Sequence, residues 1–212
     1  MAQKIKFFID FDNTLFDPRP LKKAIFDVFE SAGFAKDEVS SSYKEVCRLF
    51  DNNYSPERQA KFLFETRSFD EDYALKKINK AVRECSGYLF SDSIDFLAGL
   101  DHEKFEIMLL SYGDKKFQSD KVKCCGVEKY FNKLYFCQEE KWIFLKKLVE
   151  PGERFIIIDD RGDALDNIAK EFNNSLTIQI KRADEPLDIA EHFSAYDGIS
   201  VTDLFSAEKY LV

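Results

Sequence analysis

The stretch Phe7-Phe8-Ile9-Asp10-Phe11-Asp12-Asn13-Thr14-Leu15 decides the fold, because an apolar run changes there into two carboxylates two residues apart. The apolar residues between Ile5 and Ile9 predict a buried β-strand. In open α/β sheets, ligands bind outside the carboxyl ends of the strands, which is where Asp10 and Asp12 would lie. Two neighbouring carboxylates are unfavourable unless a cation or a shared proton compensates their charges. The stretch therefore predicts a strand that ends in a metal-binding or proton-transferring site.

The overall composition is typical of one soluble globular protein. The chain has 212 residues, of which 45% are hydrophobic and 33% are charged, and its 22 phenylalanines can supply a core. This length suits a single core that carries a smaller inserted unit. The sequence has no long apolar run and no signal-type segment at its N-terminus, so we expect a cytoplasmic protein without a membrane partner.

The net charge and the cysteine spacing argue against a nucleic-acid-binding protein and against one stabilised by zinc or disulfides. The net charge of -8 produces a surface field that disfavours a nucleic-acid partner. The five cysteines have no CxxC spacing, which argues against a structural zinc site or a disulfide framework. We expect reduced thiols, and a chain that is a monomer or a weak dimer.

Residues 18–90 show helical periodicity almost throughout, and no convincing strand falls among them. We predict helices at 21–32, at 36–51, from Pro56 onward and at 70–85. A glycine or a capping residue marks several of the helix ends. These helices predict a small helical bundle.

After Ser91 the pattern changes to short apolar runs that alternate with helical segments, as in βαβ units and parallel sheets. Strands are predicted at 105–110, 134–137, 155–158, 176–180 and 199–201, and helices at 92–100, 117–124, 139–148, 163–172 and from 203. The first strand must join this sheet, because a helical bundle offers it no pairing partner. We therefore predict an α/β protein whose Rossmann-like parallel sheet, flanked by helices, is formed by residues 1–17 and 91–212, with an inserted helical bundle at 18–90.

Polar clusters follow three of the predicted strands. The second strand ends in Ser111-Tyr112-Gly113, and a later one ends in Asp159-Asp160. A serine with a following glycine can offer a hydroxyl and backbone N–H groups to phosphate oxygens, and the acidic pair suits Mg²⁺. Taken alone, Ser111-Tyr112-Gly113 could be a plain turn, and Asp159-Asp160 could cap a helix. Parallel topology would bring both to the edge that holds Asp10 and Asp12, which favours a phosphoryl-transfer site.

The clusters resemble the motifs of the haloacid dehalogenase superfamily of phosphatases and phosphotransferases. Asp10-Phe11-Asp12-Asn13-Thr14 is similar to the first motif, DxDxT, Ser111 to the second, and Asp159-Asp160 to the fourth. For the third motif, a lysine, Lys141 is favoured because it opens the helix after the 134–137 strand, and Lys133 is the competitor. The helical insertion resembles the α-helical cap that these enzymes carry after their first motif.

The sequence departs from the family pattern at two places. Trp142 replaces the proline that often follows the motif lysine, and Ala164 stands where many relatives have a second acid four residues after Asp160. Asp163 is four residues after Asp159, so the register of the fourth motif stays open. We favour Asp160 as a direct Mg²⁺ ligand and Asp159 as a water-mediated one.

The resemblance implies a role for each candidate residue. Asp10 would be the nucleophile that forms an aspartyl-phosphate, Asp12 the general acid and base, and Ser111 and Lys141 the groups that hold the phosphoryl charge. The implied Mg²⁺ ligands are Asp10, Asp12 through its backbone carbonyl, Asp159 and Asp160. The implied substrate-binding residues are Thr14, Tyr112, Gly113 and, in the cap, Arg48.

These roles predict a Mg²⁺-dependent phosphatase for a small phosphorylated metabolite. A phosphomutase would use the same residues, and a non-catalytic module that binds a phosphorylated ligand is a further alternative. A dehalogenase is less favoured, because a halide leaves without a proton and needs no acid at Asp12.

Overall fold

The computed structural model describes residues 3–66, 68–182 and 196–211. The chain divides into two units. The sheet unit consists of Met1–Phe16, Leu89–Tyr112 and Val127–Val212, and the helical unit consists of Asp17–Tyr88 and Gly113–Gly126.

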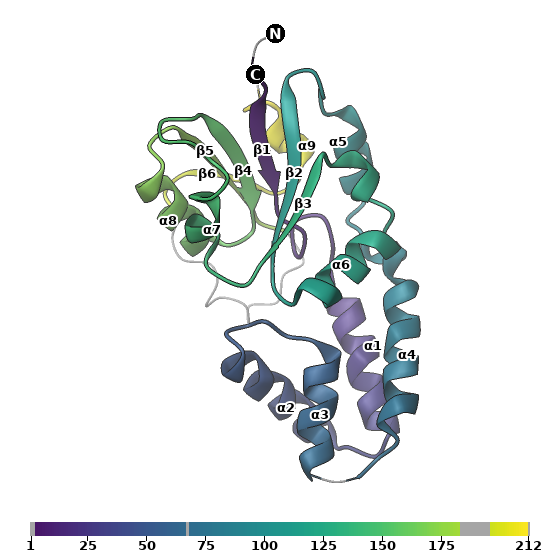
Figure 1. Cartoon of the computed structure of the whole chain (residues 1–212). Coiled ribbons are helices and arrows are strands. Elements are labelled where there is room, and N and C mark those ends of the chain that lie inside the picture. Colours follow the sequence, from purple (N-terminus) through teal and green to yellow (C-terminus); the bar gives the residue numbers. More distant parts are fainter. Residues whose placement is uncertain (1–2, 67, 183–195, 212) are drawn as a thin grey trace. The chain divides into compact units, whose positions relative to one another are not determined.

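The sheet unit is built on six parallel strands in the order β3-β2-β1-β4-β5-β6 (Figure 1). The strands are β1 (Ile5–Ile9), β2 (Phe105–Tyr112), β3 (Lys133–Cys137), β4 (Phe155–Asp159), β5 (Ser175–Ile180) and β6 (Ile199–Val201). The first strand lies in the middle of the sheet, where β2 and β4 pair with it on either side. The residues that follow β1 therefore lie between the ends of two other strands, and the predicted Rossmann-like sheet is confirmed.

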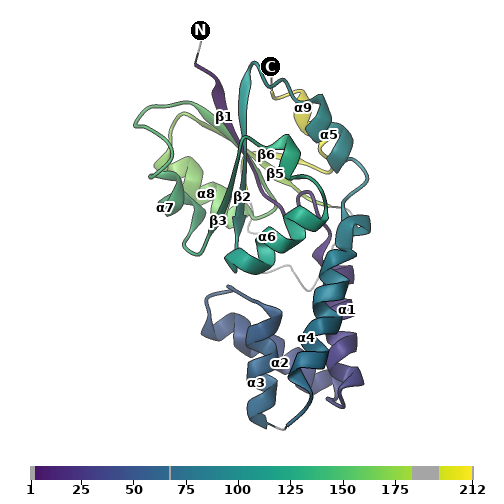
Figure 2. The same cartoon turned by 45° about the vertical axis from the view of Figure 1, so that its right-hand side comes forward.

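Both faces of the sheet are buried, which explains why its central strands are continuous apolar runs. Figure 2 shows α7 (Lys141–Leu145) and α8 (Gly162–Glu171) on one face and α5 (Ser93–Gly99) and α9 (Phe205–Glu208) on the other. Phe8 of β1 packs into a core with residues of α7 and α8, whereas its neighbour Phe7 meets Phe96 of α5 edge to face. Successive side chains of a strand point to opposite faces, so β1 contributes to both cores.

The helical unit contains α1 (Pro18–Ser31), α2 (Lys36–Leu49), α3 (Pro56–Thr66), α4 (Glu71–Arg83), the 3-10 turn η1 (Cys85–Tyr88) and α6 (Lys115–Cys124). Its helices are amphipathic, and α1 buries Leu21, Ile25 and Phe29 on one stripe. We expected residues 113–126 in the core, but they group with the helices here. Their helix α6 contacts α4 and η1, and the buried thiols of Cys85 and Cys125 lie 3.8 Å apart.

The strands lie where the sequence predicts them, with β2 longer by two residues and β3, β4 and β5 each longer by one. The largest difference is α7, which we predict at 139–148 and which spans only Lys141–Leu145, followed by turns. A further 3-10 turn, η2 (Glu128–Tyr130), precedes β3. Within the described part of the chain, none of the helices combines the length and the apolar character needed to cross a membrane.

Candidate active site at the carboxyl edge of the sheet

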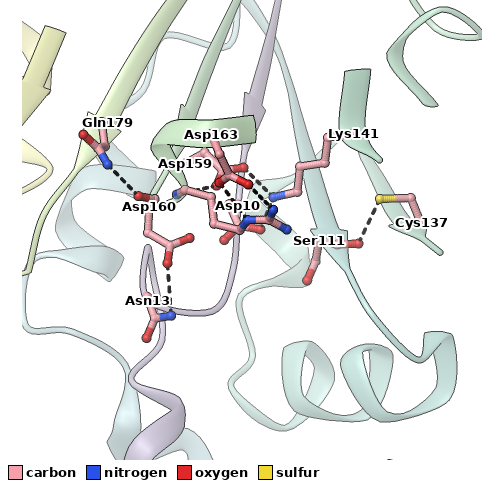
Figure 3. Close-up of polar contacts among 10 residues, drawn as sticks. Asp10, Asn13, Ser111, Cys137, Lys141, Asp159, Asp160, Asp163 and Gln179 are labelled. Carbon is pink, nitrogen blue, oxygen red and sulfur yellow. Dashed lines mark hydrogen bonds and ion pairs between the residues drawn. The ribbon is translucent and has the colours of Figure 1, made fainter. Parts of the chain in front are cut away.

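The carboxyl ends of β1, β2 and β4 bring together the polar residues that follow them. The backbone N–H of Asp10 donates to the carbonyl of Ile158 at 3.0 Å, which places Asp10 beside the end of β4. Ile9 is in register with Leu109 of β2, two residues before Ser111. Figure 3 shows Asp10, Ser111, Asp159 and Asp160 at this edge.

Three carboxylates form a buried cluster at the edge. Asp10, Asp159 and Asp160 each offer an oxygen atom, and these atoms all lie within 4.8 Å of one another. The three residues are 5%, 0% and 8% exposed. Buried carboxylates of this density need a compensating cation or proton, because water cannot solvate them.

Lys141 supplies one positive charge to this cluster. Its ammonium lies 2.5 Å from Oδ1 of Asp10 and 2.5 Å from Oδ2 of Asp159, and its side chain is 6% exposed. Burial alone would lower the pKa of Lys141, but the two carboxylates outweigh it and raise the pKa above its ordinary value. The competing Lys133 pairs with Glu106 in an exposed ion pair at 2.9 Å. Of the two candidate lysines, the structure brings Lys141 to the site.

One ammonium does not balance the charge of three carboxylates, and the pKa values of two of these carboxyls lie above their ordinary value. Burial raises the pKa of Asp10 to about 7, against the lowering effect of Lys141, and the charges of Asp159 and Asp12 raise it further. Burial and the charges of Asp159 and Asp10 also hold the pKa of Asp160 well above its usual range. A divalent cation would remove this imbalance. The buried all-oxygen donor set fits Mg²⁺, which binds through carboxylates and water.

Two side chains that we did not predict support Asp160. The amide of Asn13 donates to Oδ2 of Asp160 at 3.1 Å from a left-handed backbone position with φ of 58°. The amide of Gln179, in β5, donates to the carbonyl of Asp160 at 3.0 Å. The signal for Gln179 was present in the sequence, since it is a polar residue inside the apolar run 176–180. The amide of Asn13 can thus orient the carboxylate of Asp160, while the amide of Gln179 holds the backbone that carries it.

The remaining candidates of the sheet unit lie around this cluster or near it in the chain. Asp12 is half-buried and forms an isolated β-bridge with Phe16. Thr14 is buried, and its carbonyl, rather than its hydroxyl, accepts a hydrogen bond from Arg182. Tyr112 is the half-buried last residue of β2. Asp163 lies in the first turn of α8, where the helix dipole favours an acid, and forms an ion pair with Arg161.

Two candidates belong to the helical unit. Gly113 has φ of 135°, a backbone conformation in which an L side chain is strained, so glycine is favoured there. Arg48 lies in α2 and pairs with Glu45 at 2.6 Å, with 68% of its side chain exposed. Substrate contact by Arg48 stays a prediction.

The chain matches no protein-family model and no curated protein sequence. Solved structures do match it over nearly their whole length. A protein of Burkholderia xenovorans described as a haloacid dehalogenase-like hydrolase has a TM-score of 0.76 at 17% identity, with 97% of each chain covered. A protein of Bacillus subtilis described as the HAD-hydrolase YfnB, bound to magnesium, has a TM-score of 0.65 at 14% identity, with 99% of each chain covered.

A third similar structure is the L-2-haloacid dehalogenase of Xanthobacter autotrophicus, with a TM-score of 0.66 at 14% identity; 99% of this chain and 98% of that chain are covered. The chain therefore has the fold of the haloacid dehalogenase-like hydrolases. Proteins described as hydrolases and as dehalogenases share this fold, so the reaction must be argued from the site itself.

Proposed function

We propose that the protein is a Mg²⁺-dependent phosphatase that acts on a small phosphorylated metabolite through an aspartyl-phosphate on Asp10. The observation that carries the proposal is the buried contact of Lys141 with both Asp10 and Asp159. This contact places a fixed positive charge against the candidate nucleophile, at the sheet edge that also holds Ser111. A developing phosphoryl charge would be stabilised there by preorganised groups.

In the first step, a carboxylate oxygen of Asp10 attacks phosphorus. An O–P bond to Asp10 forms, the ester P–O bond breaks, and Asp12 gives its proton to the departing alkoxide. In the second step, Asp12 takes a proton from water, the water oxygen attacks phosphorus, and the O–P bond to Asp10 breaks to release phosphate. Asp12 thus returns to its starting state, and one hard displacement becomes two easier ones.

Lys141 and Ser111 would serve both steps. The ammonium of Lys141 favours the ionised form of Asp10 and thus opposes the burial that raises the pKa of this carboxyl. Ser111 is 1% exposed in β2, so its hydroxyl can hold a phosphoryl oxygen without competition from bulk water.

Asp10, Asp159 and Asp160, with the backbone carbonyl of Asp12, would hold Mg²⁺. When bound, the ion would offset charge on the phosphoryl oxygens during transfer. The magnesium bound to the similar YfnB structure and the carboxylate cluster of this chain both support this part of the proposal.

The presence of Asp12 favours phosphate esters over haloacids. An alkoxide needs a proton in order to leave, whereas a halide does not, and Asp12 is the acid two residues from the nucleophile. A phosphomutase would use the same residues and would differ in the acceptor that takes the phosphoryl group from Asp10. The helical unit resembles the α-helical cap of the family, and a cap of this kind would restrict the substrate to a small molecule.

Purified protein with p-nitrophenyl phosphate and Mg²⁺ tests the proposal. We expect turnover that chelation abolishes and that Asp10→Asn reduces to background. Asp203→Asn is the control, because this carboxylate accepts a hydrogen bond from the backbone of Ser206 instead of contributing to the cluster. Absence of turnover on a panel of phosphate esters, or halide release from 2-haloacids by the same sample, would contradict the proposal.

A further inference from the structure

A buried arginine lies against the backbone of the loop that follows β1. Arg182, two residues after β5, donates from Nη1 to Oδ2 of Asp92 at 2.7 Å, and the side chains of both residues are 7% exposed. Its Nη2 donates to the carbonyl of Thr14. Its guanidinium also lies over the ring of Phe90, 4.1 Å from the ring centroid. The three contacts fix the guanidinium in one place and orientation.

Asp92 joins this arginine to two more segments of the sheet unit. It is the N-cap residue of α5, yet its side chain makes no capping hydrogen bond to that helix. Its Oδ2 instead accepts from the backbone N–H of Leu204 at 2.8 Å, in addition to Arg182. The pair therefore connects the segment after β5, the start of α5, the residue before α9 and the loop of Thr14.

The loop from Phe11 to Phe16 has its own backbone hydrogen bonds, a contact from Asn13 to Asp160, and external contacts at its far end. The backbone N–H groups of Leu15 and Phe16 both donate to the carbonyl of Phe11, so the loop is a tight turn. The carbonyl of Leu15 accepts from the backbone N–H of Phe90 at 3.0 Å and from the hydroxyl of Ser93 at 2.8 Å. At its near end the loop is anchored by β1, from which the chain continues into it. Asp12 lies between these two anchors.

Stability alone does not explain why Arg182 and Asp92 form a buried ion pair here. An isolated buried ion pair gives little net stabilisation compared with apolar residues of similar volume, because both ions lose their water. Asp92 Oδ1, Arg182 Nε and the hydroxyl of Thr14 are buried and have no hydrogen-bond partner in the described chain. The forked guanidinium is suited to holding a carboxylate and a backbone carbonyl at fixed positions.

We propose that Arg182, oriented by Asp92, is a positioning residue that fixes the loop of Thr14 and thereby places Asp12 for proton transfer. The inference rests on the proposed function of Asp12. Asp10 is held separately by its backbone hydrogen bond to Ile158 and by Lys141, so its attack on phosphorus does not depend on Arg182. Loss of the pair should therefore impair proton transfer more than nucleophilic attack, because small displacements of a catalytic group are costly.

The first test separates the two steps by leaving group. Rapid-mixing experiments measure the first release of phenol from phenyl phosphate, which needs a proton, and of 2,4-dinitrophenol from its phosphate, which leaves as an anion. For Arg182→Met we expect a loss of about 10²-fold with phenyl phosphate and of less than about 3-fold with the dinitrophenyl ester, in line with the usual contribution of a general acid. Arg182→Lys should recover part of the loss.

The second test needs no activity. Amide hydrogen exchange should increase for residues 12–16 in Arg182→Met and in Asp92→Asn, while β1 and β4 stay protected. Asp92→Asn keeps an oxygen for the N–H of Leu204 and is the milder variant if Arg182→Met fails to fold. Lys6→Met is the matched control, because Lys6 likewise contacts one carboxylate, that of Glu153 at 2.9 Å, and one backbone carbonyl, that of Leu148 at 2.5 Å.

Equal losses with both leaving groups, or unchanged exchange at residues 12–16 in both variants, would overturn the positioning role. Faster exchange over the whole sheet, or the same selective loss in Lys6→Met, would also overturn it in favour of a general effect on stability. If the unmodified protein hydrolyses neither ester, the proposed function fails, and the exchange measurement still decides whether Arg182 fixes the loop.

Discussion

The ammonium of Lys141 lies 2.5 Å from Oδ1 of Asp10, although the two residues are 131 positions apart in the chain. β1 places the carboxylate and the start of α7 places the ammonium. The contact joins the proposed nucleophile to a buried ammonium that faces the carboxylate cluster, which is the proposed metal site. Most of the following predictions concern the balance of charge around it.

Removing the ammonium should damage both activity and stability. For Lys141→Met we expect turnover to fall by about 10²–10³-fold, because a preorganised positive group near the transferring charge is lost. At about pH 8 the metal-free variant should lose roughly 3–5 kcal/mol in its free energy of unfolding, since two buried carboxylates lose their partner. Urea unfolding and ester hydrolysis measure the two effects. Lys133→Met, which removes an exposed ion pair, should change neither, and an equal effect of both variants would contradict the account.

The raised pKa of Asp10 predicts how the stability of the metal-free protein depends on pH. The pKa is 3.8 in the reference state and about 7 in the folded protein, so folding favours the protonated carboxyl. The stabilising contribution of this group is complete below about pH 4 and is lost as the pH rises to about 7. Asp160 acts in the same direction. Urea unfolding in the presence of a chelator should show a weaker fall over this window for Asp10→Asn, and an unchanged fall would contradict the assignment.

Mg²⁺ should reverse this pH dependence. The ion binds ionised carboxylates and must displace the protons that the metal-free cluster holds, so its affinity rises with pH. We expect Mg²⁺ to increase Tm more at about pH 8 than at about pH 6. At about pH 8 and a Mg²⁺ concentration of about 100 Kd, the increase should correspond to about 2.7 kcal/mol in the free energy of unfolding. Thermal unfolding measures this. Asp160→Asn should remove most of the increase, and Asp203→Asn should keep it.

Gln179 should matter for the metal site without touching substrate. Gln179→Leu leaves the buried carbonyl of Asp160 without its donor, which costs about 1–3 kcal/mol in unfolding free energy. With the backbone of Asp160 held less firmly, its carboxylate should bind Mg²⁺ about 10-fold more weakly, as measured by titration calorimetry. Thr177→Val is the control in the same strand, because the hydroxyl of Thr177 contacts Tyr196 instead. Equal Mg²⁺ affinity in Gln179→Leu and the unmodified protein would argue against a supporting role.

Local patterns were sufficient to predict the sheet and the edge where the site lies. Strands buried on both faces must be apolar runs, and parallel pairing aligns their ends, so the position of Asp10 beside Ser111 and Asp159 followed from periodicity. The choice of Lys141 over Lys133 followed from the family resemblance and was not decided by spacing alone. Which of the two lysines reaches Asp10 depends on the path of the chain after β3, and sequence spacing does not determine that path.

Residues that act through the backbone were missed for a physical reason. Arg182 contacts the carbonyl of Thr14, which lies 168 positions away, and Gln179 contacts the carbonyl of Asp160. Every residue carries such a carbonyl, so no pattern of side chains marks the acceptor. The sequence signal was a polar residue inside the apolar run of β5 (Gln179) or just after it (Arg182), where side chains often reach solvent and need no buried acceptor.

The account depends most directly on the covalent intermediate at Asp10. Protein mixed with a phosphate ester and Mg²⁺, quenched in acid during turnover and digested, can be analysed by mass spectrometry of its peptides. We expect a phosphoryl group on the peptide that contains Asp10, localised to that aspartate, and its absence from the Asp10→Asn protein. Turnover without any phosphorylated peptide, or a phosphoryl group on a different residue, would contradict the account.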